Sequence, residues 1–398
     1  MRALQGLTPF TLSSGVITTA SDYGERLALV ACAQLRVVRP LDVARTGASG
    51  EVSKRSRARK NGTVKVLVTG GAGYIGSNVA LALVEAGHQV CIFDLVGAES
   101  SPVAAEIESL TGVRVDHVTG DVRDLDSLRA VLSRGDFDAC IHLAGLKSVG
   151  ESHSKPIEYY WTNVTGTAFL VQAMIEAGVE SLVFSSSATV YGEPQGCPIA
   201  ESHPTGQGLT NPYGRSKFMA EEILRDAASA HVALKVTALR YFNPVGAHSS
   251  GLLAERPTGQ PTNIAPVILE AALGIREHLD VYGADYPTRD GTGVRDYIHV
   301  SDLARGHVAA IESAANGWRA INLGTGDGTS VLELIDYFTS VSGLPVPVQI
   351  KPRRAGDVAV CFSDPSLAAR ELGWTAELSV EKACHDAWSA RSGELRRS

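Results

Sequence analysis

The stretch of sequence that decides the fold is Val64-Lys65-Val66-Leu67-Val68-Thr69-Gly70-Gly71-Ala72-Gly73-Tyr74-Ile75-Gly76. Its first six residues predict a buried strand, and a helix is expected directly afterwards over residues 76–85. Gly70 permits a tight turn, Gly73 lets the backbone approach a pyrophosphate, and Gly76 allows the helix to pack closely on the strand. The spacing therefore indicates a dinucleotide site with the phosphates at the helix N-terminus.

A carboxylate follows at the end of the next expected strand. Asp94 lies eighteen residues beyond Gly76, where it can accept hydrogen bonds from the adenosine ribose hydroxyls. It would repel a 2′-phosphate, so the pattern favours NAD over NADP. A second carboxylate, in Gly120-Asp121-Val122, follows a strand expected around residues 113–118 and could meet the adenine amino group.

Apolar runs alternate with helix-length segments through the first part of the chain. The strands expected there are Val64–Val68, Val90–Phe93, Ala139–Leu143, Leu182–Ser185 and Val236–Leu239. This alternation predicts the α/β class, with a doubly wound parallel sheet covered by helices on both faces. After Phe242 the regularity weakens, and Gly and Pro become frequent. We therefore expect a Rossmann-like NAD-binding domain over residues 63–243 and a smaller mixed α/β substrate domain over residues 244–398.

Residues 1–62 differ in composition from the rest. They contain ten Lys and Arg against four Asp and Glu, a net charge of +6, which leaves −13 of the total of −7 for residues 63–398. The segment ends in a basic run over residues 54–62 that is typical of a linker. A disordered extension and an organelle-targeting segment are both open readings of this composition.

Composition limits the possible functions. The chain has 398 residues, of which 44% are apolar and 20% charged, so it can bury a sizeable core. A net charge of −7 argues against general binding to nucleic acid or to a membrane surface, and no apolar run is long enough to span a bilayer. The six cysteines form no C-x-x-C motif, which predicts no metal site and a reducing compartment, the cytoplasm.

Candidate catalytic residues come from two segments. Ser185-Ser186-Ser187 ends an expected strand, and Tyr213 and Lys217 follow with a spacing of four, which places both on one face of a helix. An ammonium beside a phenol favours the phenolate, so we expect Lys217 to lower the pKa of Tyr213. Hydroxyls next to such a pair suit proton transfer to and from an alcohol, and a nearby dinucleotide points to hydride chemistry.

From Val64 to about Trp374 the chain resembles the UDP-galactose 4-epimerases, members of the extended short-chain dehydrogenase/reductase superfamily. The resemblance rests on motifs spread along the chain: Gly70–Gly76, Ala144–Ser152, Ser185–Gly192, Pro212–Lys217, Leu239–Ala247 and Gly291–Val300. It implies an NAD-dependent isomerase that interconverts UDP-glucose and UDP-galactose through a transient 4-keto sugar. Tyr213 would take the proton of the sugar 4-hydroxyl, Ser187 would bind the reacting oxygen, and Lys217 would bind the nicotinamide ribose.

The resemblance also implies two sets of binding residues. Those expected to contact a tightly bound NAD are Gly70, Gly73, Tyr74, Ile75, Gly76, Asp94, Asp121, Val122, Leu143, Ala144, Gly145, Lys147, Asn163, Ser187, Tyr213, Lys217 and Phe242. Those expected to contact the UDP-hexose are Ser187, Asn243, Asn263, Tyr282, Arg295, Arg354, Asp357 and Cys361. The two arginines suit the diphosphate, because a guanidinium can bind two oxygens at once.

One position bears on which sugar is accepted. Some relatives carry a tyrosine at the position of Cys361 and others a small residue, so the cysteine leaves room for an N-acetyl group. UDP-N-acetylhexosamines are therefore candidate substrates beside UDP-glucose.

Other activities remain to be weighed against the epimerase. A 4,6-dehydratase shares the tyrosine and lysine but uses Asp-Glu where this chain has Ala188-Thr189. Another UDP-sugar epimerase or decarboxylase and a non-catalytic NAD sensor are the remaining alternatives. The family resemblance also implies a homodimer, with the segments around Ser154–Ala177 and Ser216–Ala230 as candidate interface helices.

Overall fold

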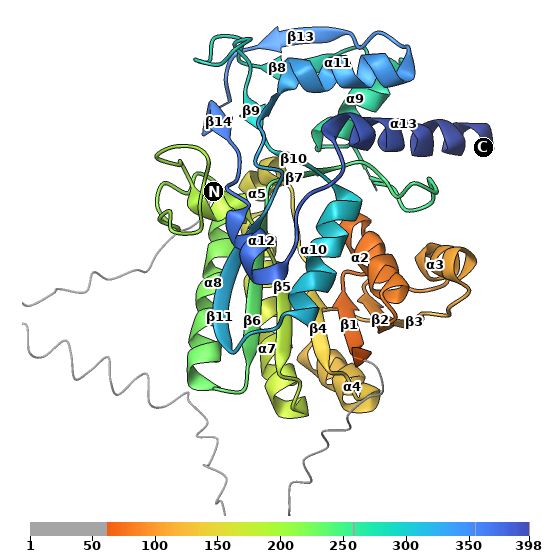
Figure 1. The fold of residues 1–398 in the computed structure, drawn as a ribbon, viewed down its shortest axis with the longest axis vertical. Coiled ribbons are helices and arrows are strands. Elements are labelled where there is room, and N and C mark those ends of the chain that lie inside the picture. The colour runs from red at the N-terminus through yellow and green to blue at the C-terminus, as the bar shows by residue number, and fades with distance from the viewer. Residues whose placement is uncertain (1–61, 258, 355, 398) are drawn as a thin grey trace, which may run out of the picture. The chain divides into compact units, whose positions relative to one another are not determined.

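The computed structural model describes residues 62–257, 259–354 and 356–397. The extension expected over residues 1–62 lies outside this range, apart from Gly62. Figure 1 shows a central sheet with helices around it and a group of smaller elements above the sheet.

Seven parallel strands form the central sheet, in the order β11-β6-β5-β4-β1-β2-β3. Their bounds are β1 Lys65–Thr69, β2 Gln89–Asp94, β3 Asp116–Thr119, β4 Ala139–His142, β5 Ser181–Ser187, β6 Lys235–Tyr241 and β11 Gly317–Leu323. The doubly wound parallel sheet expected from the alternation of strands and helices is confirmed. The strand order reverses between β1 and β4, and ligands of such sheets bind at that point.

Helices cover both faces of the sheet. The helices and helical turns are α2 Tyr74–Glu85, α3 Val103–Thr111, α4 Leu125–Gly135, α5 Val149–Ser154, α6 Pro156–Tyr160, η2 Trp161–Thr165, α7 Gly166–Ala177, η3 Ala188–Tyr191, α8 Pro212–Ala230, α9 Ile264–Ala272, α10 Val300–Glu312, α11 Val331–Ser342, α12 Ser366–Leu372 and α13 Val380–Arg397. Val66 and Val68 pack with α2, α10 and α12, while Leu67 between them packs with α4, α7 and α8. Because alternate side chains of a strand point to opposite faces, this apolar run forms two cores.

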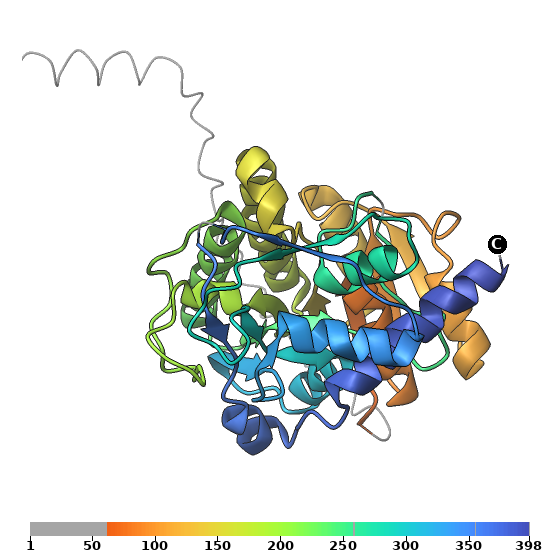
Figure 2. The ribbon, with the colours of Figure 1, turned by 90° about the horizontal axis from the view of Figure 1, so that it is seen from above.

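The second part of the chain builds its own small core and also returns to the sheet. Short strands β7 Asn243–Val245, β8 Leu279–Tyr282, β9 Val294–Arg295, β10 Tyr297–His299, β12 Thr329–Ser330, β13 Val348–Lys351 and β14 Val360–Cys361 accompany α9, α11 and α13. Figure 2 shows α11 and α13 lying side by side. Strand β11 lies beyond the boundary expected at residue 243, yet it completes the central sheet. The division at residue 243 into an NAD-binding domain and a substrate domain remains a prediction.

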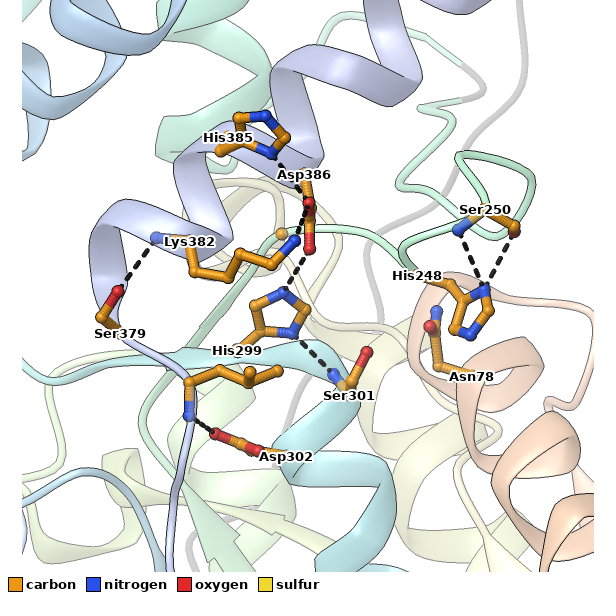
Figure 3. Close-up of polar contacts among 12 residues, drawn as sticks. Asn78, His248, Ser250, His299, Ser301, Asp302, Ser379, Lys382, His385 and Asp386 are labelled. Carbon is orange, nitrogen blue, oxygen red and sulfur yellow. Dashed lines mark hydrogen bonds and ion pairs between the residues drawn. The ribbon is translucent and has the colours of Figure 1, made fainter.

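A buried polar cluster fixes the last helix to the rest of the fold (Figure 3). His299 caps α10, because its Nδ1 accepts a hydrogen bond from the amide of Ser301 at 3.0 Å. Its Nε2 therefore donates to Asp386 of α13 at 3.3 Å, and Lys382 donates to the same carboxylate at 2.6 Å. The cluster joins α13 to the start of α10.

No helix within the described ranges combines the length and the apolar character needed to cross a membrane. The same residues contain no group of three or more His, Cys, Asp or Glu side chains that could hold a metal ion.

Close packing of the glycine turn gives a first test. A Cβ added to Gly76 would lie 2.1 Å from the carbonyl oxygen of Gly70, which is backbone and cannot turn aside. We expect Gly76→Ala to lower the free energy of unfolding by about 1–3 kcal/mol or more. Gly150→Ala is the matched control, since Gly150 lies in α5 and a Cβ there meets nothing within 4 Å. Urea unfolding of both variants measures the difference, and equal stabilities would contradict the packing argument.

Candidate active site

The glycine turn leaves the start of α2 open to a ligand. Gly70 has φ +71°, and a Cβ there would lie 2.5 Å from the backbone nitrogen of Ala144 after β4. Gly73 is the N-cap of α2 and gives the helix no side-chain cap. The first-turn amides of α2 therefore face the cavity without a side-chain partner, which is the arrangement that binds phosphate.

Two carboxylates stand at the ends of β2 and β3. Asp94 accepts hydrogen bonds from the amides of Ala72 and Val96, both at 3.0 Å, so it also holds the glycine turn in place. Asp121 is bonded by the guanidinium of Arg123, which lowers the pKa of that carboxyl. Both side chains line the main cavity, at the positions expected for contacts to an adenosine.

The main cavity has a volume of about 810 Å³ and brings most of the predicted site residues together. Of the predicted cofactor residues, all line it except Asn163; of the predicted substrate residues, Ser187, Asn243 and Asn263 line it. The structure thus places the glycine turn, the Ser-Tyr-Lys set and two asparagines around one space.

Asn163 lies beneath the cavity wall. Its side chain is buried, accepts a hydrogen bond from the amide of Leu146 at 2.8 Å and donates to the carbonyl of Leu146 at 3.0 Å. It also donates to Ser216 of α8 at 2.9 Å. Asn163 therefore positions the turn after β4 against α8 in this structure.

Helix α8 presents the tyrosine and the lysine in its first two turns. Asn211 is its N-cap and accepts a hydrogen bond from the amide of Gly214 at 2.8 Å, and Pro212 occupies the first helical position. Lys217 is buried and its ammonium donates to the carbonyl of Ser185 at 2.7 Å. The spacing of four predicted from the sequence is realised on the face of α8 that meets β5.

Ser187 is oriented as a hydrogen-bond donor. Its oxygen accepts bonds from the amide of Thr189 at 3.2 Å and from the hydroxyl of Thr189 at 3.0 Å. A hydroxyl that accepts two bonds keeps its own proton for a third partner. That proton is donated to Tyr213 here, and this hydrogen bond lowers the pKa of that phenol.

The pKa expectation for Tyr213 is wrong for the chain's own groups. Burial raises the pKa of Tyr213, and the hydrogen bond from Ser187 opposes this without reversing it. Burial also lowers the pKa of Lys217 to about 8, against the attraction of Glu221. The ammonium of Lys217 donates to a backbone carbonyl. The loss of hydration on burial therefore affects the pKa of Tyr213 more than the ammonium that the spacing of four places nearby.

Five predicted substrate residues lie outside the cavity lining. Arg354 donates to Asp357 at 3.0 Å, and its guanidinium lies 4.4 Å from the ring centroid of Tyr282. Arg295 and Cys361 are paired across the parallel strands β9 and β14. The structure therefore gathers these residues in two groups on the second part of the chain.

Cys361 approaches the cavity indirectly. It packs against a small apolar cluster of Val190, Tyr191, Ile199 and Phe242, of which Phe242 lines the cavity. The cysteine thus stands behind the part of the cavity wall that Phe242 forms.

Sequence reasoning missed a loop that borders the cavity. Arg256 lines it and forms ion pairs with Glu106 of α3 at 3.1 Å and with Glu394 of α13 at 3.0 Å. Glu255, next along the chain, pairs with Lys147 at 2.7 Å and accepts a bond from Asn263 at 2.5 Å. No local pattern predicts these contacts, because most of the partners lie more than a hundred residues away.

Comparison with known proteins identifies the family of this chain. The profile of the NAD dependent epimerase/dehydratase family matches residues 66–324, which include the glycine turn, the Ser-Tyr-Lys set and strand β11. The chain belongs to the NAD-dependent epimerase/dehydratase family.

Relatives within this epimerase/dehydratase family are similar over nearly their whole length. The UDP-glucose 4-epimerase of Mus musculus is 50% identical over 332 residues, covering 81% of this chain and 95% of the relative. That of Bacillus subtilis is 48% identical, covering 83% and 97%. A crystal structure of UDP-glucose 4-epimerase from Bifidobacterium longum in complex with NAD+ and UDP has a TM-score of 0.79 at 49% identity, covering 83% of this chain and 99% of that one.

Burial of Lys217 makes a prediction about stability. Because its pKa is lowered to about 8 by burial, the folded state releases this proton before the unfolded state does. The destabilisation is complete below about pH 8 and is relieved as the pH rises toward 10.5, the ordinary value. We expect Lys217→Met to be more stable than the wild type at pH 7 by up to roughly 3–4 kcal/mol, the free energy that corresponds to a pKa lowered from 10.5 to about 8.

Urea unfolding between pH 7 and pH 10 measures this gain, which should shrink as the pH rises. Lys147→Met is the control, because that ammonium is 55% exposed and its removal should give no pH-dependent gain. A Lys217→Met protein that is less stable than the wild type at every pH would contradict the argument.

Proposed function

We propose that this protein is a UDP-glucose 4-epimerase that interconverts UDP-glucose and UDP-galactose with NAD kept bound. The observation that carries the proposal is that one cavity joins a phosphate-binding helix start, a Ser-Tyr-Lys set and the two asparagines 243 and 263. Relatives with this name are about 50% identical over more than four fifths of the chain.

The residues present fit NAD. Added Cβ atoms at Gly70 and Gly76 would collide with backbone, so only glycines allow the turn that opens the start of α2 to a pyrophosphate. Asp94 fits the ribose hydroxyls of an adenosine without a 2′-phosphate. The turn after β4, which includes Gly145 and Lys147, lies between this end and Lys217. When bound, NAD accepts a hydride from C4 of the hexose and returns it.

The chain's own groups move the proton. Tyr213 takes it from the sugar 4-hydroxyl and returns it to the same oxygen when the 4-keto sugar is reduced, and Ser187 donates a hydrogen bond to that oxygen. Lys217 supplies a buried positive charge and binds the nicotinamide ribose. Because the polypeptide alone raises the pKa of Tyr213, the phenolate depends on positive charge brought close to it, and burial makes that charge effective.

Nucleotide binding is assigned to the second part of the chain. Arg295 and Arg354 bind the diphosphate, while Tyr282 and Asp357 support Arg354. These residues hold the uridine diphosphate end, and the hexose makes fewer contacts. A weakly held 4-keto sugar can turn over and receive hydride on its other face.

The alternatives have less support. A 4,6-dehydratase needs an acid near the 6-hydroxyl, but Thr189 stands in that place and donates to Ser187. A non-catalytic sensor would not need Ser187, Tyr213 and Lys217 in one cavity. An epimerase or decarboxylase for another UDP-sugar remains an outcome of the substrate test below.

The first test follows the proposed activity. Purified protein without added NAD should convert UDP-galactose to UDP-glucose, and Tyr213→Phe should lower the rate roughly 10²- to 10⁴-fold, since it removes the proton-transfer group. Chromatography of the nucleotide sugars measures the conversion, and the NAD content of both proteins should be equal. Wild-type protein that converts no UDP-galactose, even with NAD supplied, would refute the assignment.

Sugar size gives a second prediction. A small side chain at Cys361 leaves space behind Phe242, so we propose that UDP-N-acetylglucosamine is also a substrate. A neighbour described as the UDP-Glc/GlcNAc 4-epimerase from Campylobacter jejuni is 36% identical with a TM-score of 0.72. Cys361→Tyr should abolish turnover of the N-acetyl sugar and spare UDP-galactose, whereas Cys361→Ser should keep both. Unchanged N-acetylhexosamine turnover in Cys361→Tyr would refute the gate.

We also propose a homodimer through the helices expected from the sequence. Ile157, Trp161 and Met219 are 76%, 53% and 44% exposed, and they lie on α6, η2 and α8, which pack side by side. Large apolar side chains grouped on one surface indicate an interface, and a second copy fits the family.

A charge at this surface tests the dimer. Trp161→Glu should halve the mass measured by analytical ultracentrifugation, because it places a carboxylate in an apolar interface. Val232→Glu is the control, since Val232 is 87% exposed and lies beyond the end of α8. A wild type that sediments as a monomer at micromolar concentration would contradict the proposal.

For the compartment, we propose the cytoplasm. The five cysteines among the described residues are free: Cys91, Cys140, Cys197, Cys361 and Cys384. Unpaired cysteines fit a reducing compartment. Residues 1–62 keep organelle targeting open as the alternative.

A further inference from the structure

Three consecutive serines at the end of β5 have three different partners. Ser185 and Ser187 line the cavity, while Ser186 points to the other face and is 1% exposed. The carbonyl of Ser185 accepts from Lys217, as described above, and the hydroxyl of Ser186 donates to Glu221 of α8 at 2.5 Å. Because side chains alternate along a strand, Ser185 and Ser187 face the cavity, while Ser186 between them contacts helix α8 behind it.

Glu221 extends the active face of α8 by one more turn. It follows Tyr213 by eight residues and Lys217 by four, and its side chain is fully buried. Because residues four apart stack on a helix, its carboxylate lies one turn below the ammonium. Its charge opposes the effect of burial on the pKa of Lys217.

Arg240 neutralises this carboxylate. It lies on β6, is 3% exposed, and donates to the two oxygens of Glu221 at 2.9 and 2.6 Å. It also donates to the hydroxyl of Tyr191 at 3.1 Å, and that hydroxyl donates to Asn322 of β11 at 2.7 Å. The network spans α8, β5, β6 and β11 directly behind the reacting groups.

Stability alone does not account for such a pair. A buried ion pair is often no more stabilising than apolar side chains of the same volume, because both charges lose their hydration. This one instead connects the strand that carries Ser187 to the helix that carries Tyr213 and Lys217. The pair is therefore placed to support the reaction geometry, in which each reacting atom must lie within a fraction of an ångström of its productive position.

We propose that Glu221, held by Arg240, is a positioning residue that fixes Ser187 against Tyr213 and Lys217 by tying β5 to α8. The inference rests on the proposed epimerase function. His142 on β4 interacts electrostatically with Lys217, while Tyr159 meets the ring of Tyr213 edge-on and buried Tyr241 interacts with Tyr213. His142 stays neutral near pH 7, because burial lowers its pKa to about 3.

Two variants test the two connections of Glu221, one to β5 and one to β6. Ser186→Ala cuts the tie to β5 and leaves the ion pair intact. Glu221→Gln/Arg240→Met removes both charges together, so that no lone charge stays buried. Thr237→Val is the control. Thr237 lies on β6, the strand of Arg240, but its hydroxyl accepts a hydrogen bond from Arg319 of β11, and it does not line the cavity.

Steady-state kinetics with UDP-galactose between pH 6 and pH 10 and thermal unfolding measure the effects. We expect Ser186→Ala to lower kcat about tenfold with KM nearly unchanged and the pH profile in place. The double variant should lower kcat by about 10²-fold with KM nearly unchanged, because it breaks the connection of α8 to β6 that holds the reacting groups in place. Thr237→Val should lower only the unfolding midpoint.

The proposal is overturned if both variants keep the wild-type kcat and pH profile and change only the unfolding midpoint, as the control does. If the double variant does not fold, Ser186→Ala decides alone, and a wild-type kcat there overturns the tie. Should the wild type not convert UDP-galactose, the epimerase assignment fails separately. The unfolding measurements on Ser186→Ala and on the double variant need no substrate, so they still report whether the connection between β5 and α8 stabilises the fold.

Discussion

The turn after β1 and the turn after β4 approach each other more closely than any side chain would allow, and the rest of the site depends on this approach. Gly70 leaves no room for a Cβ beside Ala144, and Gly76 leaves none beside Gly70. The chain leaves these neighbouring strands in opposite directions, so their ends open a crevice at the carboxyl edge of the sheet. The open start of α2, Asp94 and the turn that carries Lys147 all lie around that crevice.

Burial then sets the pKa values of the candidate catalytic groups Tyr213 and Lys217. Tyr213 and Lys217 both lose hydration on α8, which raises the pKa of the first and lowers that of the second. Burial thus favours the neutral form of both groups, and a bound positive charge is needed to favour the phenolate. Below them Glu221 and Arg240 are paired in the same low-dielectric layer, while the arginines assigned to the diphosphate stand on more exposed elements. The groups proposed for proton transfer thus lie on β5 and α8, and those proposed for nucleotide binding lie on the second part of the chain.

Much of the fold could be predicted because its signals are local. Apolar runs buried on both faces, the glycines of residues 70–76 and the spacing of Tyr213 and Lys217 each act over a few residues, and the structure realises all of them. The sheet partner of β6 could not be predicted, because β11 comes about eighty residues later. The contacts of Arg256 with Glu106 and Glu394 escape for the same reason. The pKa of Tyr213 in the polypeptide alone could not be predicted, because spacing reveals the neighbouring charge of Lys217 and not the depth of burial.

Retention of the C4 hydrogen tests the central claim most directly. UDP-galactose carrying deuterium on C4 of the sugar would be converted by the protein in ordinary water, and the UDP-glucose formed would be analysed by mass spectrometry and NMR. Transfer of this hydrogen to a bound cofactor and back, while Tyr213 handles only the hydroxyl proton, predicts that the deuterium stays on C4 in the product. Loss of the deuterium to solvent would contradict the account, since it would show proton abstraction from carbon in place of hydride transfer.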